Sequence, residues 1–137
     1  MKIVLSDKEL ISVIHSALCN GLDYISGYQM SVQMTKDTYQ EAKASIKEEE
    51  RSEFNQYFKG TICIEEVLVK HLSNGNTLNF WDGTTEEVVG FDLAKAKENL
   101  QNEDVTEHVL SMLNETDDAI TADCILQSAI FGDIIYG

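Results

Sequence analysis

Six side chains in this sequence have the chemistry of metal ligands or nucleophiles, and they are widely spaced: Cys19, Cys63, Cys124, His15, His71 and His108. None of them has the paired spacing of a zinc finger. His15 and Cys19 stand one helical turn apart, which favours a histidine at the edge of the core beside a buried cysteine. The oxygen-rich segment 114–118 lacks the glycine and the alternating ligands of an EF-hand loop. We therefore expect no metal ion and no cofactor.

Motifs of covalent and phosphate chemistry are absent from the sequence. It contains no GxSxG around a serine, no GxGxxG and no P-loop. The carboxylates of Glu65-Glu66 and of Glu86-Glu87 are adjacent in the chain, so the two members of each pair point to different faces of a helix or strand. Acid–base catalysis by a carboxyl pair requires both groups to face one substrate. We expect that the protein is not an enzyme.

The acidic residues are concentrated in the second half of the chain. The sequence has 24 Asp and Glu against 10 Lys and Arg, a net charge of −14. Residues 61–137 hold 15 of the acidic residues and three of the basic ones, and no Lys or Arg follows Lys97. This negative charge disfavours direct binding to nucleic acids or anionic membranes and favours a positively charged protein partner.

We predict that eight of these carboxylates form a partner-binding acidic face. Carboxylates three or four residues apart on a helix lie about 5–6 Å apart, similar to successive phosphates along a nucleic-acid strand, so such a face can imitate a nucleic acid. Part of the acidity has a simpler explanation, because carboxylates at a helix N-terminus favour the helix dipole. A solvated acidic surface without a partner is the alternative. The predicted face consists of Glu98, Glu103, Asp104, Glu107, Glu115, Asp117, Asp118 and Asp123.

Trp81 is the aromatic side chain best placed for an exposed contact. Neighbouring side chains of a strand point to opposite faces, so a buried Phe80 directs Trp81 toward solvent or a partner. An exposed aromatic side chain can stack on a nucleobase. Tyr28 shares the inward alternation of Met30 and Val32, and we predict that it belongs to the core.

Apolar residues at helical spacing predict most of the chain to be helical. The first helix begins at a capping box formed by Ser6 and Glu9 and is predicted to end at Gly21. The chain from Thr35 to Gly60 is polar and helix-favouring, and further helices are expected at 61–73, after Asp92, from about residue 105, and from about residue 120 to Gly132. Segment 47–53 is expected to be a solvated helical face or a connector.

Alternating apolar residues predict a small antiparallel sheet. Segment 28–34 is one strand, and a hairpin follows with its turn at Asp82-Gly83 and its return strand at 87–91. Segment 133–136 is expected to be a final short strand. We predict a single compact α+β domain over residues 1–137, in which the sheet and its hairpin pack against several helices. The sequence has no long apolar run, no signal peptide and an odd number of separated cysteines, so we expect a cytoplasmic location without membrane contact.

Several blocks of the sequence resemble a family of small bacteriophage and prophage proteins. These blocks are ALCNGLDYISGY at 17–28, CIEEVL at 63–68, DDAITAD at 117–123 with ILQ at 125–127, and YG at 136–137. They span most of the chain, so the resemblance implies a shared fold. Ile64 stands where we would expect an aromatic residue in that family. No activity is assigned to the family, so the resemblance carries over no site residue.

The resemblance implies a phage setting, in which small acidic proteins recurrently act on host machinery by imitating nucleic acids. We therefore expect a phage-encoded inhibitor that acts in the host cytoplasm on a basic, nucleic-acid-handling defence protein such as a CRISPR effector. Two alternatives are a phage accessory protein whose acidity serves solubility and a protein that sequesters a nucleotide signal in a homo-oligomer. The cations available to a nucleotide are Lys36, Lys43, Lys47, Arg51, Lys59 and Lys70.

Overall fold

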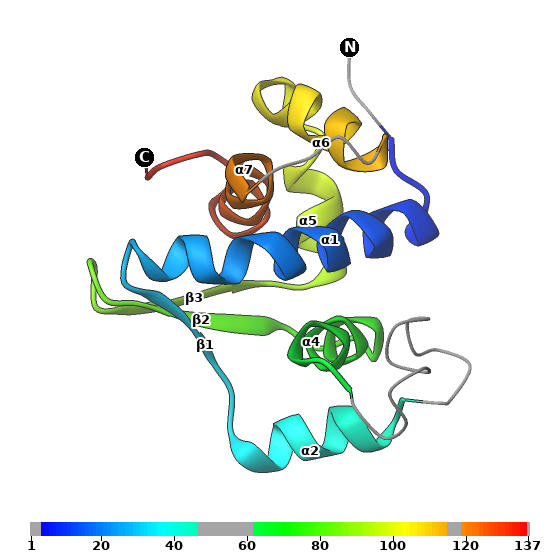
Figure 1. The fold of residues 1–137 in the computed structure, drawn as a ribbon, viewed down its shortest axis with the longest axis vertical. Coiled ribbons are helices and arrows are strands. Elements are labelled where there is room, and N and C mark those ends of the chain that lie inside the picture. The colour runs from blue at the N-terminus through cyan, green and yellow to red at the C-terminus, as the bar shows by residue number, and fades with distance from the viewer. Residues whose placement is uncertain (1–3, 47–61, 115–118, 137) are drawn as a thin grey trace.

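The computed structural model describes residues 4–46, 62–114 and 119–136, and it confirms the predicted α+β class (Figure 1). The helices in these residues are α1 (Asp7–Ser26), α2 (Lys36–Ala44), α4 (Ile64–Ser73), α5 (Leu93–Asn99), α6 (Thr106–Leu113) and α7 (Ala119–Phe131), with a 3₁₀ turn at Glu103–Val105. The strands are β1 (Met30–Gln33), β2 (Leu78–Asp82) and β3 (Glu87–Phe91). None of the described helices is both long and apolar enough to cross a membrane.

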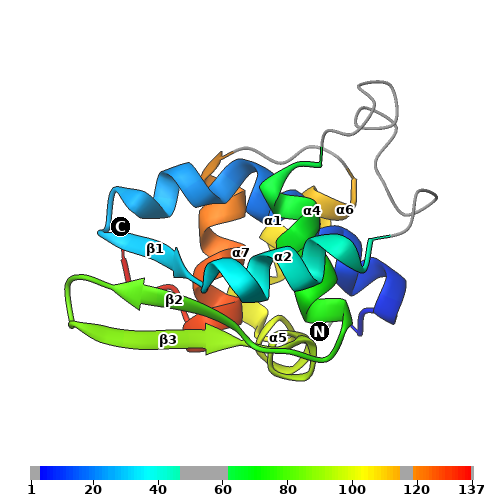
Figure 2. The same ribbon diagram turned by 90° about the horizontal axis from the view of Figure 1, so that it is seen from below.

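The helices lie on both sides of the sheet. Figure 1 shows α1 along one face of the sheet with α7 packed against it, while α2 lies on the opposite side beyond α4. Figure 2 looks at that opposite side, where α2 and α4 lie beside the hairpin and no described helix crosses it. The core therefore forms between the inner face of the sheet, α1 and α7, and the outer face of the hairpin is open.

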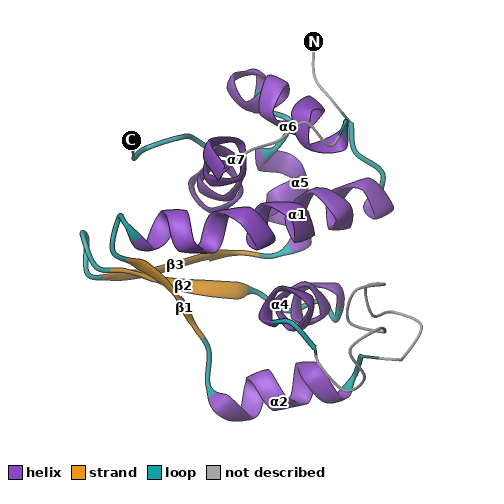
Figure 3. Ribbon diagram, in the orientation of Figure 1, coloured by secondary structure: helices purple, strands orange, loops and turns teal. Residues whose placement is uncertain are grey.

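The three strands form one sheet in the order β1-β2-β3 (Figure 3). The two faces of this sheet differ in their exposure to solvent. Val32 pairs with Phe80 and Phe80 pairs with Val89, so these side chains share the inner face, on which Phe80 is fully buried. Trp81 belongs to the outer face and is 39% exposed, which confirms its predicted direction. The outer face consists of Ser31, Gln33, Asn79, Trp81, Val88 and Gly90.

Gly21 does not end the first helix, so this prediction was wrong. α1 continues to Ser26, and Gly21 is buried where α1 crosses α7. A Cβ atom at residue 21 would lie 2.6 Å from Cδ1 of Leu126 and 3.3 Å from Cβ of Ala122. The glycine therefore allows two helices to approach closely, which is a packing role that a local sequence pattern cannot distinguish from a stop signal.

The hairpin turn is longer than predicted. Asp82 pairs with Glu87, so the chain turns over residues 83–86 instead of at Asp82-Gly83. Asp82 is a strand residue that is 1% exposed. Its carboxylate accepts hydrogen bonds from the N–H of Thr84 and the hydroxyl of Tyr136. This distant partner, which the sequence does not reveal, places Asp82 inside the ladder.

Helix ends that depend on neighbouring residues are confirmed. The capping box of Ser6 and Glu9 is present, Asp92 accepts a hydrogen bond from the N–H of Lys95 at 2.8 Å, and Gly132 follows α7 with a φ of 80°. The predicted strand at 133–136 is wrong, because this segment is irregular. Segment 47–53 lies outside the described residues.

Candidate functional site

Three of the eight predicted carboxylates line one open recess at the end of α5. Glu98 lies in the last turn of α5, and Glu103 and Asp104 lie in the 3₁₀ turn that follows; all three are exposed. We call this recess of about 630 Å³ the acidic recess; its other lining residues are Asn99, Gln101, Asn102 and Gly132. Glu107 is exposed in the first turn of α6 and extends the acidic surface beyond the recess.

Two asparagines attach the acidic recess to the rest of the fold. Asn99 Nδ2 donates to the carbonyl of Ala129 at 2.8 Å, and Asn102 Nδ2 donates to the carbonyl of Gly132 at 3.1 Å. Asn102 Oδ1 also accepts from the N–H of Asp104 at 3.0 Å, capping the 3₁₀ turn. The turn between α5 and α6 is therefore bound to the C-terminal end of α7, so the carboxylates extend from an anchored backbone.

The described lining of the acidic recess contains no lysine or arginine. Two lysines precede the recess on α5, but both interact elsewhere. Lys95 Nζ donates to the carbonyl of Gly90 at 2.8 Å, and Lys97 Nζ lies 3.6 Å from Oδ1 of Asp7. The recess therefore keeps its negative potential, which favours an ammonium or guanidinium group from outside the chain.

Asp123 is not part of an exposed acidic face, so this prediction was wrong. It is 4% exposed, and its carboxylate accepts hydrogen bonds from Gln127 Nε2 at 2.9 Å and from the Tyr28 hydroxyl at 3.3 Å. Burial raises the pKa of Asp123, and the two hydrogen bonds oppose that shift. All residues from 121 to 130 of α7 are buried, so this helix has no polar face to which Asp123 could belong.

The remaining predicted carboxylates are not placed by the structure. Glu115, Asp117 and Asp118 lie outside the described residues. The described acidic surface is therefore the acidic recess with Glu107 beside it.

A pair of stacked tyrosines joins two buried carboxylates, an arrangement that the sequence did not reveal. The rings of Tyr28 and Tyr136 lie 5.4 Å apart, with the Tyr28 hydroxyl on Asp123 and the Tyr136 hydroxyl 2.7 Å from Oδ2 of Asp82. The hydrogen bond to Asp82 is the main cause that raises the pKa of Tyr136. Burial, followed by the charge of Asp123, raises the pKa of Tyr28 to about 12. Since each carboxylate is hydrogen-bonded within the fold, we assign this network to stability.

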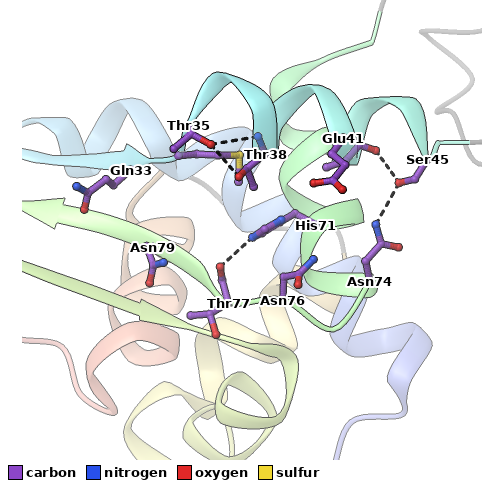
Figure 4. Close-up of a pocket in the computed structure, with 12 residues that line it drawn as sticks. Gln33, Thr35, Thr38, Glu41, Ser45, His71, Asn74, Asn76, Thr77 and Asn79 are labelled. Carbon is purple, nitrogen blue, oxygen red and sulfur yellow. Dashed lines mark hydrogen bonds between the residues drawn. The ribbon is translucent and has the colours of Figure 1, made fainter.

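A larger cleft opens between the outer face of the sheet, α2 and the C-terminal end of α4 (Figure 4). It encloses about 800 Å³, and we call it the polar cleft. Met34 and Ala42 are its apolar lining residues, and the ten residues labelled in Figure 4 form its polar lining. The side chain of Glu41 points from α2 toward α4, which carries His71. Glu41 is the one carboxylate among the described lining residues. The sequence signal for this cleft was a group of Asn and Thr residues, which is also typical of ordinary loops.

The cysteines differ in part from the prediction. Cys19, which we predict to be buried, is exposed, and its Sγ lies 3.9 Å from Nε2 of His15, whereas Cys124 is buried. Desolvation, followed by the nearby Glu65, raises the pKa of Cys19 to about 11, so its thiol is protonated at neutral pH and is a poor nucleophile. The described residues contain no group of three or more His, Cys, Asp and Glu that could hold a metal ion.

Comparisons with protein-family models, with curated proteins and with solved structures find no match to this chain.

Proposed function

We propose that this protein is a non-enzymatic inhibitor that binds a basic, nucleic-acid-binding host protein through the acidic recess. The observation that carries this proposal is the convergence of Glu98, Glu103 and Asp104 on one recess without a described basic lining residue. The resemblance to phage proteins favours a host defence protein, such as a CRISPR effector, as the partner.

The chemistry of the recess is suited to arginine and lysine side chains. Carboxylates form short, charge-assisted hydrogen bonds with guanidinium and ammonium groups, and an arginine can meet a carboxylate with two parallel bonds. Glu107 adds a further negative charge beside the recess. The net charge of −14 would also accelerate the encounter with a positively charged surface.

The two alternatives lead to different expectations. An acidity that serves solubility alone depends on net charge and not on the position of the carboxylates. A nucleotide-sequestering protein needs cations around the phosphates, and the described lining of the polar cleft contains no lysine or arginine. Lys47, Arg51 and Lys59 lie outside the described residues, and Lys70 lines a different pocket, beside Glu66.

The proposal is tested by reversing the charge of the recess. The variant E98K/E103K/D104K and the wild-type protein are immobilised and exposed to host lysate at low and at high salt, and the bound proteins are eluted with duplex DNA. We expect the wild-type protein to retain a basic nucleic-acid-binding protein at low salt and to release it with DNA. The recess variant should lose this protein.

A matched variant separates position from net charge. D23K/E86K/E87K reverses three exposed carboxylates on α1 and the hairpin, and it changes the net charge by the same amount. We expect this control to retain the partner as the wild-type protein does. Equal capture by the wild-type protein and by E98K/E103K/D104K, with both variants folded by circular dichroism, would overturn the proposal.

A further inference from the structure

The floor of the polar cleft consists of side-chain amides that the fold does not use. Gln33 of β1 and Asn79 of β2 are cross-strand partners on the outer face of the sheet, and Asn76 lies in the loop that precedes β2. Within the described residues, none of these three amide side chains makes a hydrogen bond. Each amide has both a donor and an acceptor group, so the floor is equipped for a ligand that both donates and accepts.

The side-chain amide of Asn79 occupies space that is free because Gly90 has no side chain. Gly90 pairs with Asn79 in the ladder, and a Cβ atom at residue 90 would lie 2.7 Å from Oδ1 of Asn79. A larger residue would therefore displace this amide from its place over β3.

The walls of the polar cleft are held by hydrogen bonds within the fold. Asn74 Nδ2 donates to Oγ of Ser45 at 3.1 Å and so connects the end of α4 to the end of α2. His71 Nε2 donates to the carbonyl of Thr77 at 2.9 Å and so connects α4 to the loop before β2. A cleft with fixed walls loses little entropy when a ligand enters.

The lining disfavours anionic and apolar ligands. Its described residues include no lysine or arginine for a phosphate or a carboxylate, and Glu41 repels anions. Its apolar contribution comes from Met34 and Ala42, of which Ala42 is buried. Pockets for apolar ligands have predominantly hydrophobic walls. Most of the lining consists of neutral hydrogen-bonding side chains, which suit an uncharged ligand rich in hydroxyl groups.

Trp81 continues the floor of the polar cleft along the outer face. It lies two residues from Asn79 on β2, a distance of about 7 Å along the strand, and it points to the same face. Its cross-strand neighbours are Ser31 and Val88, and Trp81 itself is 39% exposed. An exposed indole ring offers a flat apolar surface next to the amides.

We propose that the polar cleft binds a neutral oligosaccharide. The hydroxyl groups of one sugar unit would exchange hydrogen bonds with Gln33 and Asn79, since a hydroxyl, like an amide, both donates and accepts. The apolar C–H face of the neighbouring sugar unit would stack on Trp81. This inference is independent of the acidic recess, because the two sites share no described lining residue.

The test uses the tryptophan as its own probe. Trp81 is the single tryptophan of the chain, so tryptophan fluorescence reports on this surface alone. The wild-type protein is first applied to an array of neutral glycans. The glycans that bind are then titrated into the protein in solution, and so are maltotriose, cellotriose, mannotriose and triacetylchitotriose. We expect at least one of them to shift the Trp81 emission to shorter wavelength with saturation.

Variants locate the binding on the floor of the cleft. N79A and Q33A each retain Trp81, and we expect each to weaken binding about tenfold, since each removes a hydrogen-bonding amide. Q40A removes an exposed amide from α2 outside the cleft lining, and it should bind as the wild-type protein does. Circular dichroism and thermal unfolding confirm that all three variants fold.

Three outcomes would overturn the proposal. These are failure of the wild-type protein to bind any neutral glycan on the array, binding with unchanged affinity in N79A and Q33A, and saturable binding that leaves the emission of Trp81 unchanged.

Discussion

The side-chain amide of Gln127 pairs with the main chain of Tyr136 as a neighbouring strand would. Gln127 Oε1 accepts from the N–H of Tyr136 at 2.7 Å, and Gln127 Nε2 donates to the carbonyl of Tyr136 at 3.1 Å. The same oxygen accepts from the N–H of Ile135 at 2.9 Å, and the same nitrogen donates to Asp123. One fully buried side chain on α7 therefore binds the C-terminal tail to the core.

Replacement of Gln127 by leucine tests this role of the amide. Leucine has a similar size but leaves the buried carboxylate of Asp123 and the main chain of Tyr136 without this partner. We expect Q127L to lower the free energy of unfolding by about 3 kcal/mol, measured by urea denaturation. Q40L, on the exposed surface of α2, should change it by less than about 0.5 kcal/mol. Equal stability of Q127L and the wild-type protein would show that the Gln127 amide does not stabilise the attachment of the C-terminal tail.

Replacement of Tyr136 by phenylalanine tests the contact with Asp82. The Tyr136 hydroxyl lies 2.7 Å from a carboxylate that is 1% exposed, and its loss leaves that buried oxygen without this donor. We expect Y136F to destabilise the protein by about 2 kcal/mol in urea denaturation. The ring stacking on Tyr28 is retained, so the change isolates the hydroxyl.

A double-mutant cycle provides the control for this contact. D82N removes the charge, and we expect Y136F to cost about 1 kcal/mol less in the D82N protein than in the wild-type protein. Additive effects of Y136F and D82N would show that the hydroxyl and the carboxylate do not interact energetically.

Asp123 is expected to make stability depend on pH. Its pKa in the fold is raised by burial, so between the unfolded and the folded pKa the native state binds more protons than the unfolded state. The stability contribution of the protonated carboxyl is fully present below about pH 4, and it is lost as the pH rises through the folded pKa. D123N cannot ionise, so its stability relative to the wild-type protein should be highest at neutral pH and decrease on acidification.

Urea denaturation of both proteins at neutral and at mildly acidic pH measures this difference. Y28F provides a second test. The Tyr28 hydroxyl donates a hydrogen bond to Asp123 that lowers the pKa of this carboxyl, so removing the hydroxyl should raise that pKa further. We expect the stability of Y28F to vary more steeply with pH than that of the wild-type protein. A stability advantage of D123N that grows as the pH falls would contradict the assigned sign.

Gly21 should be intolerant of even one added methyl group. Alanine is favoured over glycine in a helix by about 1 kcal/mol, but the new Cβ would lie 2.6 Å from Cδ1 of Leu126. We expect overpacking to exceed the helical gain, so that G21A lowers the unfolding free energy by about 1 kcal/mol in thermal or urea denaturation. S12A, at an exposed position of the same helix, should have little effect.

A compensating variant identifies the cause of the G21A effect. L126A removes the side chain that the new methyl group would meet, at the cost of a cavity. The penalty of G21A should therefore be smaller in the L126A protein than in the wild-type protein. A stabilised G21A protein would show that α1 and α7 separate without cost.

Features that depend on neighbouring residues could be predicted from the sequence. Ser6 and Glu9 cap α1, Asp92 caps α5 and Gly132 ends α7, because each signal requires contacts within a few residues. The outward direction of Trp81 follows in the same way from the alternation of a strand.

Features that depend on a distant partner could not be predicted. Gly21 has the pattern of a helix end but lies buried against α7. Asp82 has the pattern of a turn but is held in the ladder by Tyr136. Asp123 has the pattern of an acidic surface residue but is hydrogen-bonded to Gln127 and Tyr28 in the core.

The sequence by itself determined the α+β class, most of the helices and the excess of negative charge in the second half of the chain. These properties follow from composition and short-range periodicity, which need no knowledge of the partners of each residue. The tertiary structure alone decided that Glu98, Glu103 and Asp104 line one recess while Asp123 is buried elsewhere, and that Gln33 and Asn79 are cross-strand partners on the face of the sheet that carries Trp81. Such groupings depend on helix packing and strand register, which bring together residues that lie far apart along the chain.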